Sequence, residues 1–267
     1  MDNFVIILDL LFYFFLYSII GWILESVYKS VLDKKMINSG FLYGPYCPIY
    51  GFGAVIMLLF LNKFENNVFL LFLIGFIILT VWEYLVGIFL EKVYHTKYWD
   101  YSTYRFNIKG RVCLLNSFYW GILGVIFIKI VHPVMQNIVE KLSIEWIIGL
   151  NIILFLIFLT DFVISNNKIK GIDKKLNRLK EITEVMKEKL EEIKTAKTAE
   201  TKNDEFIQNL KEAFEELKIK QDILMIKLYK QGTRLKKAFP TIQSEKINEI
   251  FNKEIDLKSL KERIHKK

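Results

Sequence analysis

The sequence predicts an all-α fold: a polytopic membrane helix bundle of about five transmembrane helices, followed by a cytoplasmic coiled-coil tail. The first observation is a series of five long apolar stretches within residues 1–165. The second is the charge, because the whole net charge of +8 lies in residues 166–267, where twenty-six basic residues outnumber eighteen acidic ones. The third is a heptad-like spacing of apolar residues in that basic part. Lipid offers the backbone no hydrogen bonds, so the apolar stretches must be helices.

The transmembrane spans are expected near residues 4–24, 45–61, 68–90, 112–131 and 146–164. Four of the apolar stretches approach the roughly twenty residues that a spanning helix needs. The second has an uninterrupted apolar run of only thirteen residues, which reach about 20 Å against about 30 Å of hydrocarbon. We therefore expect the second span to include residues from its N-terminal side. The first stretch has no basic residue before it and no cleavage pattern after it, so it is interpreted as a retained span.

The links between the spans predict the orientation of the bundle, since Lys and Arg accumulate in short cytoplasmic loops. The links after the first and third spans are rich in basic residues, and the basic tail follows the fifth. The other links carry few basic residues. With five spans, all basic segments fall on one side. This places the N-terminus outside and the C-terminus in the cytoplasm of a multi-pass protein of the cytoplasmic membrane.

Residues 40–53, which lead into the second span, hold four glycines and two of the chain's four prolines. Proline removes a backbone donor and glycine relaxes the backbone, so an irregular or partly re-entrant segment is expected. In one interpretation, which the density of Gly, Pro and Tyr favours, free backbone N–H groups hold an anionic group, as in several transporters. In the other, the segment is a tight cytoplasmic turn whose glycines let helices approach closely.

Three acidic residues fall near the predicted cytoplasmic ends of spans: Glu25, Glu83 and Asp161. The Gly/Pro segment and the next cytoplasmic loop lie on the same side, so we predict a polar vestibule that opens to the cytoplasm with Glu83 at its floor. Asp161 is interpreted as a boundary residue of its span. The residues predicted to line the substrate or ion path are Glu25, Glu83, Tyr43, Gly44, Pro45, Tyr46, Pro48, Tyr50, Trp99, Asp100, Tyr101, Arg105, Asn107 and Arg111.

Glu83 is the most informative of these residues, because a carboxylate about two turns inside a span is costly unless it is protonated, paired or in contact with water. One interpretation is a contact for an ion, a proton or a cationic substrate. The other is a structural partner for Arg105, Arg111 or a tyrosine hydroxyl. Glu25 has a simpler alternative, since Lys29 follows one helical turn later and the two side chains can pair.

No residue pattern in the sequence predicts catalysis, a metal site or a cofactor. The two cysteines, Cys47 and Cys113, form no CxxC motif, and Cys47 is interpreted as a packing residue. His95 and His132 are expected on opposite sides of the membrane, so they cannot share a metal ion. The sequence contains no nucleophile with a recognisable base and no phosphate-binding loop, so the chain is not expected to be an enzyme.

Residues 166–231 are expected to form a coiled coil or a helical hairpin. Apolar residues step three and four in two series, with Thr183 as the polar residue of the first seam and Gln221 in the second. The second series does not continue the register of the first, and a polar linker at residues 195–204 separates them. This favours a hairpin or two separately paired helices over one long rod. Gly232 is expected to end the second helix.

Residues 232–267 are expected to form a basic amphipathic segment that either docks on the hairpin or lies on the anionic inner leaflet. Its apolar positions are Ile247, Ile250, Phe251, Ile255, Leu257 and Leu260. Self-association or binding of partner helices is the expected role of the tail. Nucleic-acid binding is not expected, because acidic residues are interspersed with the basic ones.

A longer pattern joins several of these residues. It consists of Gly21, Trp22, Glu25, residues 40–53, Glu83, Tyr84, residues 99–102, Asn107, Gly110, Arg111, Ser117, Trp120 and Gly121. In this pattern the chain resembles the ABC-transporter type IV, or CmpB-type, family of bacterial membrane proteins. The resemblance covers about residues 10–125 and leaves the fifth span and the tail outside it. It implies a permease subunit, with ATP hydrolysis supplied by a separate ATP-binding subunit.

The leading hypothesis is therefore a permease-like integral membrane protein, a transporter component with a polar site open to the cytoplasm. The alternative is a membrane-anchored scaffold or sensor that acts through its cytoplasmic coiled-coil tail. Both hypotheses require the lipid bilayer as a partner.

Overall fold

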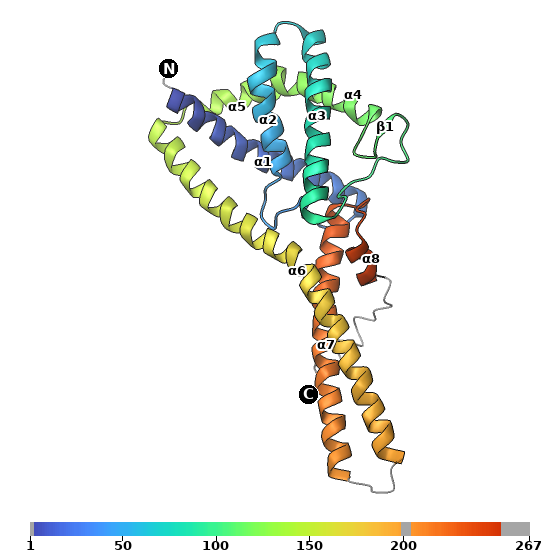
Figure 1. Cartoon of the computed structure of the whole chain (residues 1–267). Coiled ribbons are helices and arrows are strands. Elements are labelled where there is room, and N and C mark those ends of the chain that lie inside the picture. The colour runs from blue at the N-terminus through green and yellow to red at the C-terminus, as the bar shows by residue number, and fades with distance from the viewer. Residues whose placement is uncertain (1–2, 199–203, 252–267) are drawn as a thin grey trace. The chain divides into compact units, whose positions relative to one another are not determined.

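The computed structural model describes residues 3–198 and 204–251 of the chain, and it divides them into two compact units (Figure 1). Unit 1 comprises the residues up to Asn166 together with Leu235–Gln243. Unit 2 comprises the described residues of Asn167–Arg234 together with residues 244–251. The predicted limit between spans and tail lies one residue from the boundary between the units. Leu235–Gln243 was expected in the C-terminal segment, but it belongs to the unit that holds the apolar helices.

Helices make up nearly all of the described chain, as Figure 1 shows. In chain order the elements are α1 (Asn3–Asp33), α2 (Pro48–Leu61), the 3-10 helix η1 (Asn62–Phe64), α3 (Val68–Tyr94), β1 (Asn107–Ile108), β2 (Val112–Cys113), α4 (Leu114–Ile126), the π-helix η2 (Phe127–Val131), α5 (His132–Val139), α6 (Ile144–Thr198), α7 (Asp204–Ala238) and α8 (Glu245–Phe251).

Four helices are long and apolar enough to cross a membrane: Asn3–Asp33, Val68–Tyr94, Leu114–Val139 and the helix that begins at Ile144. The predicted all-α polytopic bundle is confirmed. Pro48–Phe64 is a shorter apolar helix, about 25 Å long at the usual rise per residue. A fifth span through this segment therefore stays a prediction.

The second apolar helix begins at Pro48 and continues at its C-terminal end into η1. The inclusion of residues before Pro48 in a second span stays a prediction. Cys47 is extended, with φ −118° and ψ 89°, and Pro48 opens α2. The residue before a proline avoids the helical conformation, and a proline suits the first helical turn, where its missing N–H is not needed. At the other end, η1 continues directly from Leu61.

Glycines let the helices of unit 1 approach closely, as the second interpretation of the Gly/Pro segment predicted. A Cβ atom on Gly51 of α2 would lie 2.1 Å from the Ser18 hydroxyl oxygen and 2.4 Å from the Phe14 carbonyl oxygen of α1. On α3, a Cβ atom on Gly75 would lie 3.5 Å from the Cα of Gly124 on α4. Small residues at such contacts favour helix packing in lipid, where no hydrophobic force drives helices together.

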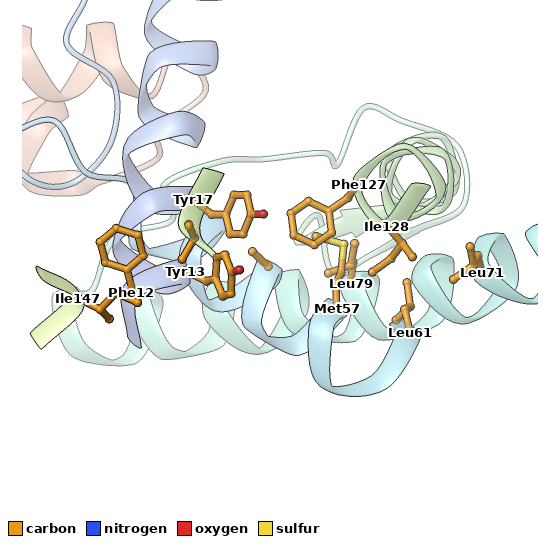
Figure 2. Close-up of a cluster of buried hydrophobic side chains, with 12 residues drawn as sticks. Phe12, Tyr13, Tyr17, Met57, Leu61, Leu71, Leu79, Phe127, Ile128 and Ile147 are labelled. Carbon is orange, nitrogen blue, oxygen red and sulfur yellow. The ribbon is translucent and has the colours of Figure 1, made fainter. Parts of the chain in front are cut away.

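The core of unit 1 lies where α1, α2, α3 and η2 meet (Figure 2). Tyr17 of α1 faces Phe127 of η2, with ring centroids 4.8 Å apart in an edge-on arrangement. Met57 and Leu79 bring α2 and α3 into the same cluster. Because interiors are packed as tightly as organic crystals, these side chains hold the helices in fixed register.

The loop between α3 and α4 contains a short antiparallel hairpin that the sequence did not predict. β1 pairs with β2, with Asn107 opposite Cys113 and Ile108 opposite Val112. Gly110 lies in the turn with a φ of 66°, a conformation that side chains rarely adopt. A Cβ atom there would lie 2.2 Å from Asp100 Oδ1, so the turn requires glycine for two reasons.

In unit 2, α7 runs antiparallel to the part of α6 that follows Asn167 (Figure 1). Lys175 Nζ donates to Gln231 Oε1 over 2.6 Å, and Gln221 Nε2 donates to Thr183 Oγ1 over 2.9 Å. The polar residues noted in the two predicted seams thus hydrogen-bond each other. Buried apolar residues of the two helices include Ile172, Leu176, Leu179, Ile193, Ile207, Leu210 and Leu228. This is the arrangement of a helical hairpin; self-association of the tail stays a prediction.

Gly232 does not end the second helix of the hairpin, because α7 continues to Ala238. A Cβ atom on Gly232 would lie 2.9 Å from the ring of Phe251, so the glycine makes room for α8. The amphipathic segment was expected either to dock on the hairpin or to lie on the inner leaflet. α8 docks on the hairpin, where Lys246 Nζ lies 2.6 Å from Asp173 Oδ2. Ile255, Leu257, Leu260 and part of the predicted linker at residues 195–204 lie outside the described residues.

Candidate functional site

Glu83 lies on α3 with only 4% of its surface exposed. Its Oε1 accepts hydrogen bonds from the Tyr101 hydroxyl (3.2 Å) and from Asn116 Nδ2 (3.0 Å). Its Oε2 accepts one from Trp120 Nε1 (2.9 Å). Asn116 Nδ2 also donates to the Tyr101 hydroxyl oxygen over 3.1 Å, so the donors form one connected network. These four residues are called the Glu83 cluster.

Two of the three donors come from the first two turns of α4. Asn116 and Trp120 are four residues apart on this helix, so their side chains lie on one face. That face meets α3, because Gly75 and Gly124 allow the two helices to approach closely. The donors therefore reach a carboxylate that lies well inside α3.

The third donor, Tyr101, comes from the loop after α3, which folds back toward the bundle. The Tyr101 N–H donates to the Gly110 carbonyl over 2.8 Å, and Trp99 Nε1 donates to the Arg111 carbonyl over 2.9 Å. Asn107 Oδ1 accepts from the Gly110 N–H over 3.0 Å. Burial, and then the charge and hydrogen bond of Glu83, raise the pKa of Tyr101 well above its usual value. Tyr101 therefore keeps its proton and remains a donor at physiological pH.

No basic side chain of residues 3–198 and 204–251 forms an ion pair with Glu83. Arg111 pairs with Glu91, with Nε 2.8 Å from Oε2, and lies 5.6 Å from the centre of the Tyr84 ring. Arg105 is exposed. Of the structural partners considered for Glu83, a tyrosine hydroxyl is present and the two arginines are not. Both carboxylate oxygens act as acceptors, which suits an ionised carboxylate.

A small cavity of about 30 Å³ adjoins the Glu83 cluster between α2, α3 and α4. Its lining residues are Ile49, Tyr50, Gly53, Met57, Leu79, Trp82, Glu83, Trp120 and Leu123. Glu83 is the only acid or base in this lining. A space of this volume can hold a group about the size of one water molecule.

Glu25 belongs to a second polar group at the end of α1 that leads into the Gly/Pro segment. Lys29 Nζ donates to Glu25 Oε1 over 2.5 Å, which is the pairing expected from their spacing. The Cys47 thiol donates to Glu25 Oε2 over 3.6 Å. Tyr50 connects this group with the first, since it lies within hydrogen-bonding reach of Glu25 and also lines the cavity beside Glu83.

Asp161 of α6 accepts hydrogen bonds from two backbone N–H groups of the Gly/Pro segment. The Gly44 N–H donates to Asp161 Oδ2 over 2.7 Å, and the Tyr43 N–H donates to Asp161 Oδ1 over 3.2 Å. Ser165, one turn further along α6, donates to the same Oδ1 over 3.1 Å. The segment thus holds an anionic group, as its first interpretation required, but that group is the chain's own Asp161.

Residues of Leu235–Gln243 lie against Lys97 and Tyr98 in the loop after α3 and against Lys29 of α1. Gln243 and Lys97 exchange two backbone hydrogen bonds of 2.8 and 2.9 Å. The Phe239 ring meets Tyr98 edge-on at 4.9 Å, and Lys29 Nζ lies 5.5 Å from its centre. This segment therefore covers one side of the Glu25–Lys29 pair.

The remaining predicted path residues lie away from the cavity, in local contacts or at the surface. Asp100 is held by Lys97 Nζ at 2.6 Å and by the Ser102 hydroxyl at 2.7 Å. Tyr46 is buried against the Phe158 ring at 5.9 Å. Pro45 is exposed and Pro48 opens α2. The predicted residues thus fall into several separate polar groups. Of these residues, only Glu83 and Tyr50 line the cavity, and Tyr101 hydrogen-bonds Glu83.

Sequence reasoning missed Asn116 as a partner of Glu83 and gave Asp161 too small a role. Asn116 lies four residues before Trp120, and this spacing of a polar residue and a tryptophan at the start of a span was the available signal. The role of Asp161 had no local signal, because its partners are backbone groups more than a hundred residues away in sequence.

The family model described as "Putative ABC-transporter type IV" matches residues 12–166. The chain belongs to this family. The match is longer than the resemblance at residues 10–125, so the expectation that the fifth apolar stretch lies outside it was wrong. The ABC-transporter type IV region ends where unit 1 gives way to unit 2 along α6, and it contains the Glu83 cluster, Glu25 and Asp161. No curated protein and no solved structure matches the chain.

Proposed function

We propose that this protein is the permease-like component of a membrane transporter and that Glu83 lies on its substrate path. The observation that carries the proposal is a carboxylate on an apolar helix that has three neutral donors, no basic partner among the described residues, and a cavity beside it. Membership of the ABC-transporter type IV family supports the same function.

The energetics of the Glu83 cluster support a role beyond packing. A charge inside a membrane is expensive, and such residues almost always face a polar pathway or pair with one another. Hydrogen bonds from neutral groups lower this cost but leave the net charge uncompensated. If this position served stability alone, an apolar residue would avoid the free-energy cost of burying a charge. A transported or coupling cation would supply the missing positive charge.

The proposal assigns no catalytic step to this chain. The sequence contains no phosphate-binding loop, so ATP hydrolysis belongs to a separate ATP-binding subunit. The basic links support an orientation with the N-terminus outside and the C-terminus in the cytoplasm. In this orientation the Glu83 cluster is reached from the cytoplasmic side through the loop that carries Tyr101.

The test is complementation of a deletion strain with Glu83→Gln, which removes the charge and keeps the shape of the side chain. Loss of complementation at a normal level of inserted protein is expected. Glu65→Gln is the matched control, because Glu65 is an exposed acid in the turn before α3. Full complementation by Glu83→Gln would contradict the proposal.

A second candidate function is a membrane-anchored scaffold or sensor that acts through unit 2. The favouring observation is that the family match ends at residue 166 while α6 continues without a break to Thr198. The test is a chain that lacks residues 188–216 and joins the shortened helices by a glycine-rich turn. This variant keeps the Thr183–Gln221 pair and Leu235–Gln243. Normal complementation would exclude the second candidate.

A further inference from the structure

The cavity beside Glu83 combines a carboxylate with aromatic rings. Three of its nine lining residues are aromatic: Tyr50, Trp82 and Trp120. The others, apart from Glu83, are aliphatic residues, Met57 and Gly53. Trp82 is held in place by a 3.1 Å hydrogen bond from its Nε1 to the Ile49 carbonyl oxygen. Trp120 is held by Glu83 itself.

We infer that this cavity binds the ammonium head of a small organic cation. The inference rests on the proposed function and names the substrate class of the same site. The Glu83 carboxylate supplies the negative charge. Among the described residues its Oε2 accepts one hydrogen bond, from Trp120, so it can accept another from an N–H of the ligand. Aromatic rings attract cations through their electron-rich faces, with tryptophan the strongest. The apolar side chains suit the methyl or methylene groups next to the nitrogen.

Other ligand classes fit this lining less well. Calcium and magnesium ions require about six oxygen ligands, whereas the lining offers one carboxylate. Among the described residues, no group of three or more His, Cys, Asp and Glu side chains gathers to hold a metal ion. An anion would be repelled by Glu83. A volume of about 30 Å³ also limits the ligand part that enters to the ammonium group itself.

Gly53 provides a way to fill the cavity without changing its charge. A Cβ atom on Gly53 would lie 3.8 Å from Leu79 and 3.9 Å from Trp82, which are ordinary contact distances. Gly53→Ala should therefore fold normally, and Gly53→Val should occupy part of the cavity. The matched control is Gly149→Val on α6, because a Cβ atom on Gly149 would have no neighbour within 4 Å.

The experiment uses the full chain in phosphatidylglycerol nanodiscs, since these head groups carry no ammonium. Methylammonium chloride is titrated against sodium chloride at constant total salt, and tryptophan fluorescence and thermal unfolding are recorded. We expect a saturable change with methylammonium and none with sodium. Glu83→Gln and Gly53→Val should each weaken methylammonium binding by about tenfold or more. The first variant removes the buried charge that pairs with the ligand, and the second fills part of the cavity. Gly53→Ala should weaken binding less, and Gly149→Val should bind like the wild type.

Equal responses to sodium and methylammonium, or wild-type binding by Gly53→Val, would overturn the assignment. If methylammonium fails to bind while Glu83→Gln still abolishes complementation, the substrate class is wrong and the proposed function stands. If methylammonium binds at Glu83 while Glu83→Gln complements fully, the cavity is an ammonium site that lies off the transport path, and the proposed function fails. Glu83→Asp keeps the charge and should retain part of the binding if Glu83→Gln does not fold.

Discussion

Glu83 and Asp161 are both acids of apolar helices in unit 1, and their oxygens are satisfied in different ways. Asp161 accepts two backbone N–H groups of the Gly/Pro segment and the hydroxyl of Ser165 on its own helix. Glu83 accepts only side-chain donors, and a cavity adjoins it. Backbone donors fix a segment in place, whereas a carboxylate beside free space can exchange partners. The comparison favours a structural role for Asp161, and it supports the proposal that Glu83 is the acid that binds a ligand.

The largest effect on stability is expected from Asp161→Ala. This substitution removes the Asp161 acceptor from the Gly44 N–H and leaves the Tyr43 N–H with the Ser165 hydroxyl oxygen, 3.2 Å away, as its acceptor. Hydrogen bonds to a charged group contribute about 1.5–3 kcal/mol each. The free energy of unfolding in detergent should therefore fall by about 3 kcal/mol. The value is at the low end for two hydrogen bonds, because water can partly replace the lost acceptor. Asp161→Asn keeps one acceptor oxygen, so its free energy of unfolding should lie between those of the wild type and Asp161→Ala. An unchanged stability would show that the Gly/Pro segment does not depend on Asp161.

Glu83→Gln is expected to reduce stability less and function more. The Gln amide keeps one acceptor oxygen for Tyr101 and Asn116 but places N–H groups opposite Trp120 Nε1. The free energy of unfolding should fall by about 1–2 kcal/mol, the usual cost of one unsatisfied buried donor. Chemical unfolding measured beside complementation separates the two effects. A stability loss as large as that of Asp161→Ala would remove the distinction between the two acids.

Phe239→Ala tests the attachment of Leu235–Gln243 to unit 1. The substitution removes an edge-on contact with Tyr98 and a ring near Lys29 Nζ, together worth about 1–2 kcal/mol beyond area burial. Amide hydrogen exchange at Ile242 and Gln243 should accelerate, while exchange at the Thr183–Gln221 layer of unit 2 should not change. Uniform acceleration in both units would indicate a global loss of stability instead.

The smallest expected effect is the pH dependence of folding stability that Asp100 contributes. Burial alone would raise the pKa of Asp100, but hydrogen bonds from Lys97 and Ser102 and the charge of Lys97 outweigh it and hold the pKa below 3.8. The ionised group therefore stabilises the folded state above its unfolded pKa, and this contribution is lost as pH falls through the lower folded pKa. The difference in unfolding midpoint between wild type and Asp100→Asn should be constant above about pH 5 and shrink below about pH 4. A difference that grows toward acid pH would contradict this sign.

Local pattern accounts for the elements that the sequence predicted well. The long apolar stretches made helices because lipid leaves the backbone no other partner. The pairing of Glu25 with Lys29 followed from a spacing of four residues on one helix. The polar residues Thr183 and Gln221 were recognised in separate seams, and the change of register between the seams favoured a hairpin or two separately paired helices over one long rod.

The sequence by itself determined the fold class and the positions of the acids along the apolar stretches, because these depend on hydropathy and short-range periodicity. Only the tertiary structure decided the partners of those acids. Asp161 meets backbone groups of residues 43 and 44, and Glu83 meets side chains of α4 and of a folded-back loop. Backbone N–H groups carry no residue-specific signature, and contacts across helices depend on which glycines allow close approach. The sequence alone shows that Glu83 lies within an apolar stretch, but its cavity forms only where α2, α3 and α4 pack together.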